Sequence, residues 1–296
     1  MRQMLGSRTS QIESARHFVS KRAQLWLYIL LIILSIIFTF PFVWTILTAF
    51  KAPYEIYVFP PPILPEQFRW SNFAEVWRQA PFLIFLLNTL TVAVLSIIGD
   101  ITTASLVAYG FARFRFPGRN LLFLVVLSGL ILPEEVTIIP QFMIYRALNW
   151  LDTLKPLILP AFLGGGAFNI FLLRQFFLTI PRDLDEAAMI DGAGSLRVLW
   201  QIILPLSKPA LATVCIFSFL FHWNDFFRPL IYLNTTERFT LSLGLRFFQT
   251  AAERGGQPLE HLLMAASVMM TLPVLVLFFS LQRYFIEGIT MSGIKR

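Results

Sequence analysis

The sequence predicts an all-α integral membrane protein with six transmembrane helices, and three observations support this fold class. Of its 296 residues 56% are hydrophobic and only 14% are charged, whereas a soluble domain is about a quarter charged. The mean hydropathy is +0.69. Six apolar stretches approach or exceed the roughly 20 residues that a helix needs to cross a bilayer. This leaves no room for a separate soluble catalytic domain.

The six expected spans cover residues 24–50, 82–111, 121–143, 157–179, 206–233 and 262–282. A basic tail, residues 1–22, precedes the first span, which is longer than the apolar core of a secretory signal. We therefore expect this span to be retained, with residues 23–296 forming the transmembrane domain. Prolines inside the spans indicate either ordinary kinked packing or helices that bend around a translocation path. They are Pro41, Pro133, Pro140, Pro160 and Pro273.

The distribution of Lys and Arg predicts that the N- and C-termini are both cytoplasmic. With the N-terminus inside, the inner segments are 1–22, 112–120, 174–208 and 283–296, and they hold 15 of the 24 Lys and Arg residues. This moderate bias follows the positive-inside rule. It also accounts for the net charge of +7 without nucleic acid as a partner.

The inner segment between the fourth and fifth spans has the most informative pattern. Pro181 ends the fourth span, and Asp183 and Asp185 are N-cap candidates whose negative charge favours a helix start. Gly192 and Gly194 can turn the chain at the other end of this short helix. One apolar and one polar face are expected on it, formed by Leu184, Ala187, Ala188 and Ile190 and by Glu186 and Asp191.

A second amphipathic piece, Leu196 to Ile203, leads through Leu204 and Pro205 into the fifth span. The pattern thus predicts two short helices and a glycine turn on the cytoplasmic membrane face. Such a hairpin fits a docking element for another protein. It also fits a membrane-surface hairpin with no partner.

The spaced residues of this segment resemble the EAA loop of ABC importer permeases. Glu186-Ala187-Ala188 is followed by Asp191-Gly192-Ala193 and then by Ile202-x-Leu204-Pro205. The wider resemblance is to the second permease subunit of sugar importers of the maltose and glycerol-phosphate type. It rests on AYGFARFRFPGRN at 108–120, NIFLLRQFFLTIP at 169–181, WND at 223–225 and the glycines and lysine of 288–295.

The resemblance implies a type I ABC importer permease fold in the plasma (inner) membrane of a prokaryote. In that family the loop, here about 181–209, forms a coupling helix that sits in a cleft of a cytoplasmic ATPase subunit. The residues that match the motif and would carry the coupling are Glu186, Ala187, Ala188, Asp191, Gly192, Ile202 and Pro205. The implied partners are a homologous second permease subunit, two ATPase subunits, a periplasmic or surface-anchored solute-binding protein, and membrane lipid.

The sequence does not indicate an enzyme. It lacks the G-x-x-x-x-G-K-[ST] nucleotide-binding motif, and Gly164-Gly165-Gly166 is better explained by a flexible or closely packed backbone. The three histidines, His17, His222 and His261, have no metal-ligand spacing. We expect no cofactor on this chain, with ATP and Mg used by the partner ATPase.

Four polar residues at membrane depth are candidates for the translocation path, because charges there are costly and often functional. They are Asp100, Glu134, Glu135 and Asn224. The three carboxylates among them would also fit structural pairs or positions near an interface. Asp225 and Arg228, three residues apart, can pair with each other.

The outer loop 234–261 is longer than a hairpin needs. In maltose-type importers the matching loop reaches into the docked binding protein, and the alternative is a solvated connector. The candidate contact residues are Gly244, Phe247, Phe248, Gly255 and Gly256.

The expected function is import of a sugar or sugar derivative that an extracytoplasmic binding protein delivers to the permease. A polyamine or amino-acid importer is the closest alternative, since the coupling logic is shared. An ion-coupled secondary transporter is less favoured, because it would not need the EAA pattern and would often show inverted repeats.

Overall fold

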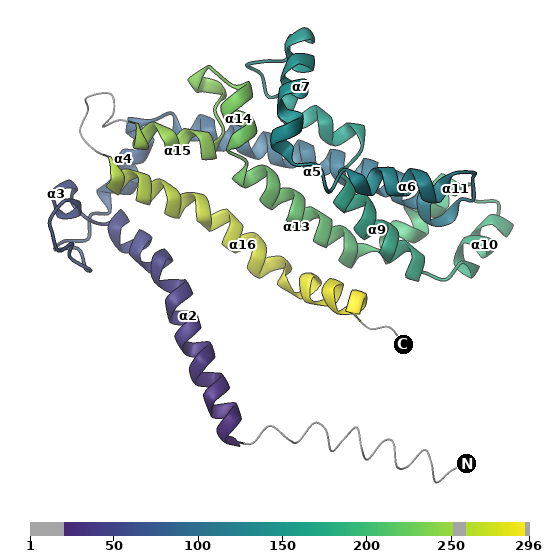
Figure 1. Cartoon of the computed structure of the whole chain (residues 1–296), viewed down its shortest axis with the longest axis horizontal. Helices are drawn as coiled ribbons and strands as arrows, with labels where there is room; N and C mark the ends of the chain where they lie inside the picture. Colours follow the sequence, from purple (N-terminus) through teal and green to yellow (C-terminus); the bar gives the residue numbers. More distant parts are fainter. Residues whose placement is uncertain (1–20, 251–258, 294–296) are drawn as a thin grey trace.

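A computed structural model describes residues 21–250 and 259–293, and this part of the chain contains helices and no strand. The helices form an elongated bundle (Figure 1). The expected basic tail lies almost entirely outside the described residues. The bounds of the helices are α2 (Lys21–Ala49), α3 (Pro53–Ile56), α4 (Ser71–Gln79), α5 (Phe82–Arg113), α6 (Arg119–Ser128), α7 (Glu134–Ala147), α8 (Lys155–Ile158), η1 (Leu159–Leu163), α9 (Ala167–Thr179), α10 (Asp183–Ile190), α11 (Ser195–Val198), η2 (Leu199–Ile203), α12 (Leu204–Leu206), α13 (Lys208–Asn224), α14 (Phe227–Tyr232), η3 (Thr236–Arg238), α15 (Leu241–Gln249) and α16 (Glu260–Gly293).

Four helical segments in the described residues are long and apolar enough to cross a membrane. They are Gln24–Ala49, Phe82–Arg113, Lys155–Thr179 and Glu260–Gln282. A fifth candidate is the pair Ser195–Leu206 and Lys208–Asn224, which is bent by 82°. The described part of the chain therefore shows four or five such segments where the hydropathy pattern predicts six.

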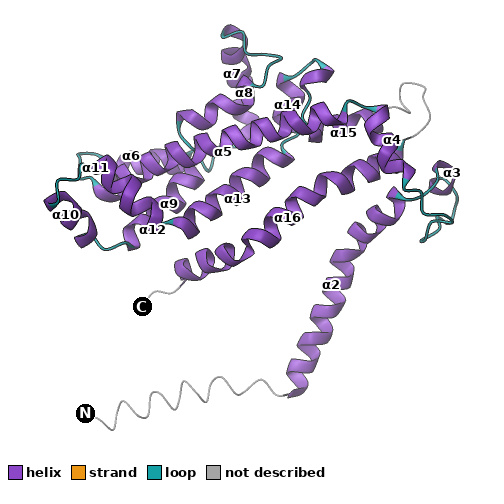
Figure 2. Ribbon diagram, turned by 180° about the vertical axis from the view of Figure 1, so that it is seen from behind, coloured by secondary structure: helices purple, strands orange, loops and turns teal. Residues whose placement is uncertain are grey.

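The difference arises in the expected third span, 121–143, which is two helices. α6 has 10 residues, so it is about 15 Å long, roughly half the thickness of the hydrocarbon core. The chain then turns, and α7 begins after Pro133 and takes another direction (Figures 1 and 2). The expected fifth span is also shorter than predicted, because α13 ends at Asn224.

α5 is the central helix and packs against α9, η1 and α13. Ala104, Ala108 and Ala112, four residues apart, are fully buried. Small residues allow helix backbones to approach closely, which favours helix association in lipid. Gly165 has a φ of +66°, and a Cβ atom there would overlap the backbone nitrogen of Ala104. The glycine run before α9 thus provides the close packing expected of it.

α2 diverges from the other helices and approaches α16 only near its own C-terminal end (Figures 1 and 2). Its apolar side chains from residue 24 to residue 43 are exposed in the isolated chain. A helix that is apolar all round is typical of a membrane span.

The two ends of the bundle carry different elements. α10 and α11 lie at one end, and α3, α4 and α15 lie at the other (Figure 2). The expected outer loop 234–261 contains α15, which is a nine-residue helix with a buried apolar face. Gly244 permits this burial, because the ring of Phe85 occupies the space that a Cβ atom would need.

Candidate functional site

The segment that resembles the EAA loop forms a separate short helix, α10, at one end of the bundle. Pro181 separates it from α9, and Asp183, Asp185 and Glu186 place negative charge in its first turn. Negative charge there is favoured by the helix dipole. Neither aspartate is an N-cap, however, because the cap position is Arg182 and it has no side-chain capping bond.

Asp185 forms a buried ion pair instead of a cap. The Nε of Arg113, the last residue of α5, lies 2.8 Å from Oδ2 of Asp185. The side chains are only 5% and 8% exposed. Burial raises the pKa of the Asp185 carboxyl, and the Arg113 guanidinium beside it acts in the opposite direction.

The outward face of α10 carries two of the residues that match the motif, Glu186 and Ala187. Glu186 and Ala187 are exposed, and Ile190 is 86% exposed. Ala188 alone of the expected apolar face turns inward, where it packs against the core that includes Val198 and Leu199. The arrangement leaves an apolar surface with an acidic edge that none of the residues in 21–250 and 259–293 covers.

Gly192 makes the turn after α10. Its φ is +81°, a left-handed conformation that suits glycine, and the backbone nitrogen of Ala193 donates to the carbonyl of Ala188 at 2.9 Å. Asp191 is exposed beside it. Gly194 has an ordinary φ of −75° and begins α11.

The second helical piece runs from α11 through η2, a π-helical turn, to α12. Pro205 has no N–H group for the carbonyl four residues earlier, and a wider turn accommodates this loss. Ile202 packs against the same core as Ala188. The chain then bends by 82° into α13, so this piece joins α10 to a membrane span.

The candidates for the translocation path do not form one cluster. Asp100 on α5 is buried, accepts a hydrogen bond from the Ser218 hydroxyl at 2.6 Å and lies 3.3 Å from Nε2 of His222. Asn224 is exposed at the end of α13. No hydrogen bond or ion pair among the described residues joins Asp100 to Asn224 or to the exposed Glu135.

Glu134 begins α7. Asp225 and Arg228 pair as the spacing predicts, with 3.1 Å between Nε and Oδ2. The pair stands at the break between α13 and α14, where the Asp225 carboxylate also accepts from the backbone nitrogen of Arg228.

Three of the five outer candidates lie in the described residues, and they pack partly or fully inside the chain. Gly244 and Phe248 are buried, and Phe247 is half-buried. Gly255 and Gly256 lie outside the described residues. In the described part of this loop, exposed residues include Arg246 and Glu237.

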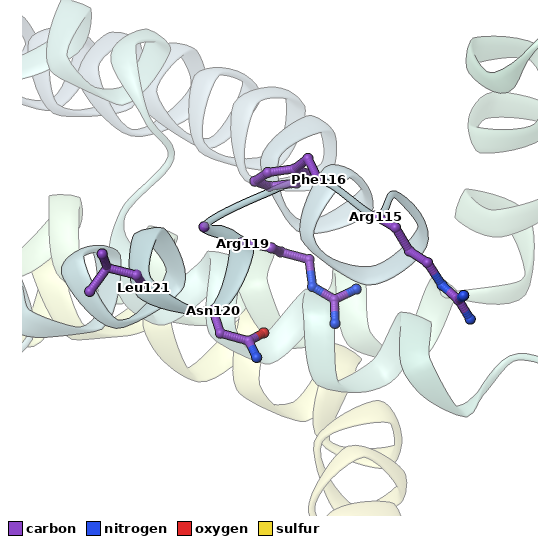
Figure 3. A pocket seen from close by; sticks show the side chains of 6 residues that line it. Arg115, Phe116, Arg119, Asn120 and Leu121 are labelled. Carbon is purple, nitrogen blue, oxygen red and sulfur yellow. The ribbon is translucent and has the colours of Figure 1, made fainter.

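A shallow basic pocket of about 330 Å³ lies in the turn between α5 and α6. Figure 3 shows Arg115, Arg119 and Asn120 projecting from this turn. Exposed Phe114 and Phe116 flank the arginines. Basic and aromatic side chains together are typical of the boundary between membrane and water.

Residues 12–291 match the model of the binding-protein-dependent transport system inner membrane components. The chain belongs to this family.

Relatives in several bacteria are permease proteins. The sn-glycerol-3-phosphate transport system permease protein of Yersinia enterocolitica is 34% identical over 90% of this chain and 95% of its own length. The diacetylchitobiose uptake system permease protein of Streptomyces coelicolor is 35% identical over 90% and 87%. The osmoprotective compounds uptake permease protein of Synechocystis is 37% identical over 80% and 79%.

A solved structure shares the fold. It is a bacterial ABC transporter involved in the import of the acidic polysaccharide alginate, and one of its chains superposes with a TM-score of 0.78 at 24% identity. The superposition covers 90% of this chain and 99% of that chain. The family match and the relatives confirm the predicted resemblance to permease subunits of sugar importers.

The sequence did not predict the pairing of Arg113 or of Ser218. Each pairs with a residue from a distant part of the chain, Asp185 and Asp100 respectively. Arg113 precedes a basic turn and looked like part of the positive-inside signal. No local pattern distinguishes it from its exposed neighbour Arg115.

Proposed function

We propose that this chain is one of two permease subunits of an ATP-binding-cassette importer, and that α10 is the coupling helix on which a cytoplasmic ATPase subunit docks. The observation that carries this proposal is the exposed outward face of α10. It belongs to a chain of the transport family and carries Glu186 and Ala187, two of the residues that match the EAA motif.

The chemistry of this face suits a protein cleft. Leu184, Ala187 and Ile190 supply apolar surface, and Glu186 supplies a charge at its edge. An exposed Ile190 gains free energy when a partner covers it, since burial of apolar surface is favourable. Small Ala187 lets the partner backbone approach closely, and Gly192 and Asp191 turn the chain away from the contact.

The proposed substrate is a sugar or a sugar derivative delivered by an extracytoplasmic binding protein. Relatives named for glycerol 3-phosphate and for diacetylchitobiose support this class. A second solved structure with the same fold is an alginate transporter in complex with a periplasmic protein bound to an alginate pentasaccharide. A polyamine or amino-acid importer has no such support among these relatives.

The proposed topology has six crossings and cytoplasmic ends, in the plasma membrane of a prokaryote. α6 with the apolar residues to Leu132 would make a short third crossing, and the bent pair ending in α13 would make the fifth. The complex would contain a homologous second permease and two ATPase subunits that bind ATP and Mg. This chain would bind no cofactor.

Purification of the tagged chain from its native membrane tests the proposal. We expect it to bring down a second permease and an ATPase, and the binding protein encoded with them to carry a saccharide detectable by mass spectrometry. Isolation of the chain alone, with solute transport that needs no ATPase, would contradict the proposal. A polyamine or amino acid on the binding protein would move the substrate class to the alternative.

A further inference from the structure

The N-terminal end of α10 is attached to the end of α5, about 70 residues earlier in the chain. Three interactions make this attachment, which we call the α5–α10 joint. Arg113 pairs with Asp185 at 2.8 Å and also donates from its Nη2 to the carbonyl of Ile180 at 3.1 Å. In return, Arg182 donates to the carbonyl of Ala112 at 3.4 Å.

The ion pair of the joint is buried, which makes it stiffer than a surface contact. The side chains of Arg113 and Asp185 are 5% and 8% exposed. A surface ion pair is screened by water and salt, but a buried pair is screened much less. Removing one partner leaves an uncompensated charge in the interior. The joint therefore resists separation of α10 from α5.

The remaining contacts of α10 attach it to the bundle less firmly than the α5–α10 joint does. Its own outward face is exposed, and it reaches the rest of the chain through Pro181 on one side and through the Gly192 turn on the other. Ala188 makes an apolar contact with the core. The specific polar attachment of its first turn is thus to α5 and not to the helices next to it in sequence.

α5 extends from the joint through the whole bundle. It has 32 residues and packs against both α9 and α13. Thirteen residues before Arg113, and so about 20 Å along the helix, Asp100 is bonded to Ser218 and lies beside His222 of α13. A movement of α10 that passes into α5 reaches the middle of the membrane domain by packed helices.

We propose that Arg113 is a positioning residue for coupling, because its buried pair with Asp185 makes α5 move with α10 when the ATPase moves. This proposal rests on the function proposed above. It adds a second route of coupling to the chain connections of α10 with α9 and α13. Arg113 would act through Asp185, without touching the ATPase or the transported solute.

The test uses the complete complex in proteoliposomes, with the binding protein as purified from the same organism. The variants Arg113→Gln and Asp185→Asn each remove the charge pair, and the second does so with almost no change in volume. We expect the ATPase subunit to co-purify and basal ATP hydrolysis to persist. The ratio of binding-protein-stimulated to basal hydrolysis should fall by about fivefold or more, the lower end of ordinary coupling between sites.

Two further variants separate coupling from general effects of charge or folding. Arg115→Gln removes a positive charge two residues away at an exposed position and should leave the ratio unchanged. Arg113→Lys keeps the charge but loses the fork that reaches both Asp185 and Ile180, so its ratio should lie between those of wild type and Arg113→Gln.

An unchanged ratio in Asp185→Asn overturns the proposal. The proposal is also overturned if both single variants, Arg113→Gln and Asp185→Asn, lose co-purification of the ATPase subunit. That result would mean that the joint is needed for folding or assembly and not for coupling. A wild-type complex without ATPase activity, or without stimulation by the binding protein, would instead refute the proposed function. The two failures are therefore distinguishable.

Discussion

Three aspartates in this chain show how environment decides the role of a residue. Asp185 is buried against Arg113, Asp100 lies inside the bundle with Ser218, and Asp152 sits at a partly exposed turn. Asp152 has a positive φ of 56°, and its carboxylate accepts from the backbone nitrogens of Asn234 and Thr235, both at 2.9 Å. It fastens the segment after α14 to the turn before α8.

Asp152 should make the stability of this attachment depend on pH. Partial burial acts to raise the pKa of the Asp152 carboxyl, but the hydrogen bonds from Thr235 and Asn234 and the charge of Arg238 outweigh it and lower the pKa. A lowered pKa stabilises the folded state above the unfolded value of about 4, and this contribution is lost as the pH falls through the folded pKa.

Replacing Asp152 by Ala removes the attachment. We expect a loss of about 0.5–1.5 kcal/mol in the free energy of unfolding at neutral pH, the net contribution of an intramolecular hydrogen bond, because the exposed Asn234 and Thr235 donors can bond to water instead. Thermal unfolding of the detergent-solubilised complex measures it, and the difference from wild type should shrink at low pH. Glu237→Gln, an exposed change in the same segment, is the control. A difference that stays constant with pH would contradict this role.

At the scale of elements, α10 combines an exposed face with a fixed base. The face carries Glu186 and Ala187, and the base carries Asp185. Residues of the exposed face and of the fixed base are neighbours within these eight residues, because successive side chains on a helix point about 100° apart. The following Gly192 has open space where a Cβ atom would project, so its positive φ is the constraint there.

Changes on this face should uncouple the transporter without unfolding it. Glu186→Lys reverses an exposed charge, and Gly192→Asp places a side chain at a left-handed turn. We expect both variants to insert in the membrane and to lose at least about 90% of uptake per ATP hydrolysed, which is about 1.4 kcal/mol of coupling. Uptake of the solute identified on the binding protein, measured with ATP hydrolysis in proteoliposomes, checks this.

Gly194→Asp is the matched control, since Gly194 has an ordinary φ and open space where a Cβ atom would project. It should transport at close to the wild-type rate. Full transport by Glu186→Lys or Gly192→Asp would contradict the assignment of α10 to coupling.

At the scale of the whole molecule, the two ends of the bundle differ in charge and in structure. The α5–α6 turn with Arg115 and Arg119 lies at the end that carries α10 (Figures 1 and 2). α15 and α4 lie at the opposite end. In the proposed topology, which follows the positive-inside rule, the first end lies in the cytoplasm, where the proposed docking of an ATPase requires it.

Cysteine labelling in intact cells tests this orientation. In a Cys215→Ser background, which removes the single native cysteine, Arg115→Cys and Glu237→Cys put one thiol at each end. Both positions are exposed. A membrane-impermeant maleimide should label residue 237 from outside and residue 115 only after the membrane is opened. The reverse pattern would overturn the topology.

The sequence by itself determined the membrane class and the family, and it predicted the coupling segment. Apolar length and charge bias are properties of continuous stretches, and the EAA spacing from Glu186 to Pro205 is also local. The glycines at 164–166 and the turn at Gly192 followed from the special backbone freedom of that residue.

The tertiary structure alone decided what the isolated polar residues do. Arg113 and Asp185 are far apart in sequence, as are Asp100 and Ser218, so no periodicity could pair them. It also divided the expected third span into α6 and α7 and placed a half-buried helix, α15, within the expected loop 234–261. Hydropathy reports how apolar a stretch is, whereas the path of the chain depends on which surfaces pack together, and those surfaces exist only in the folded protein.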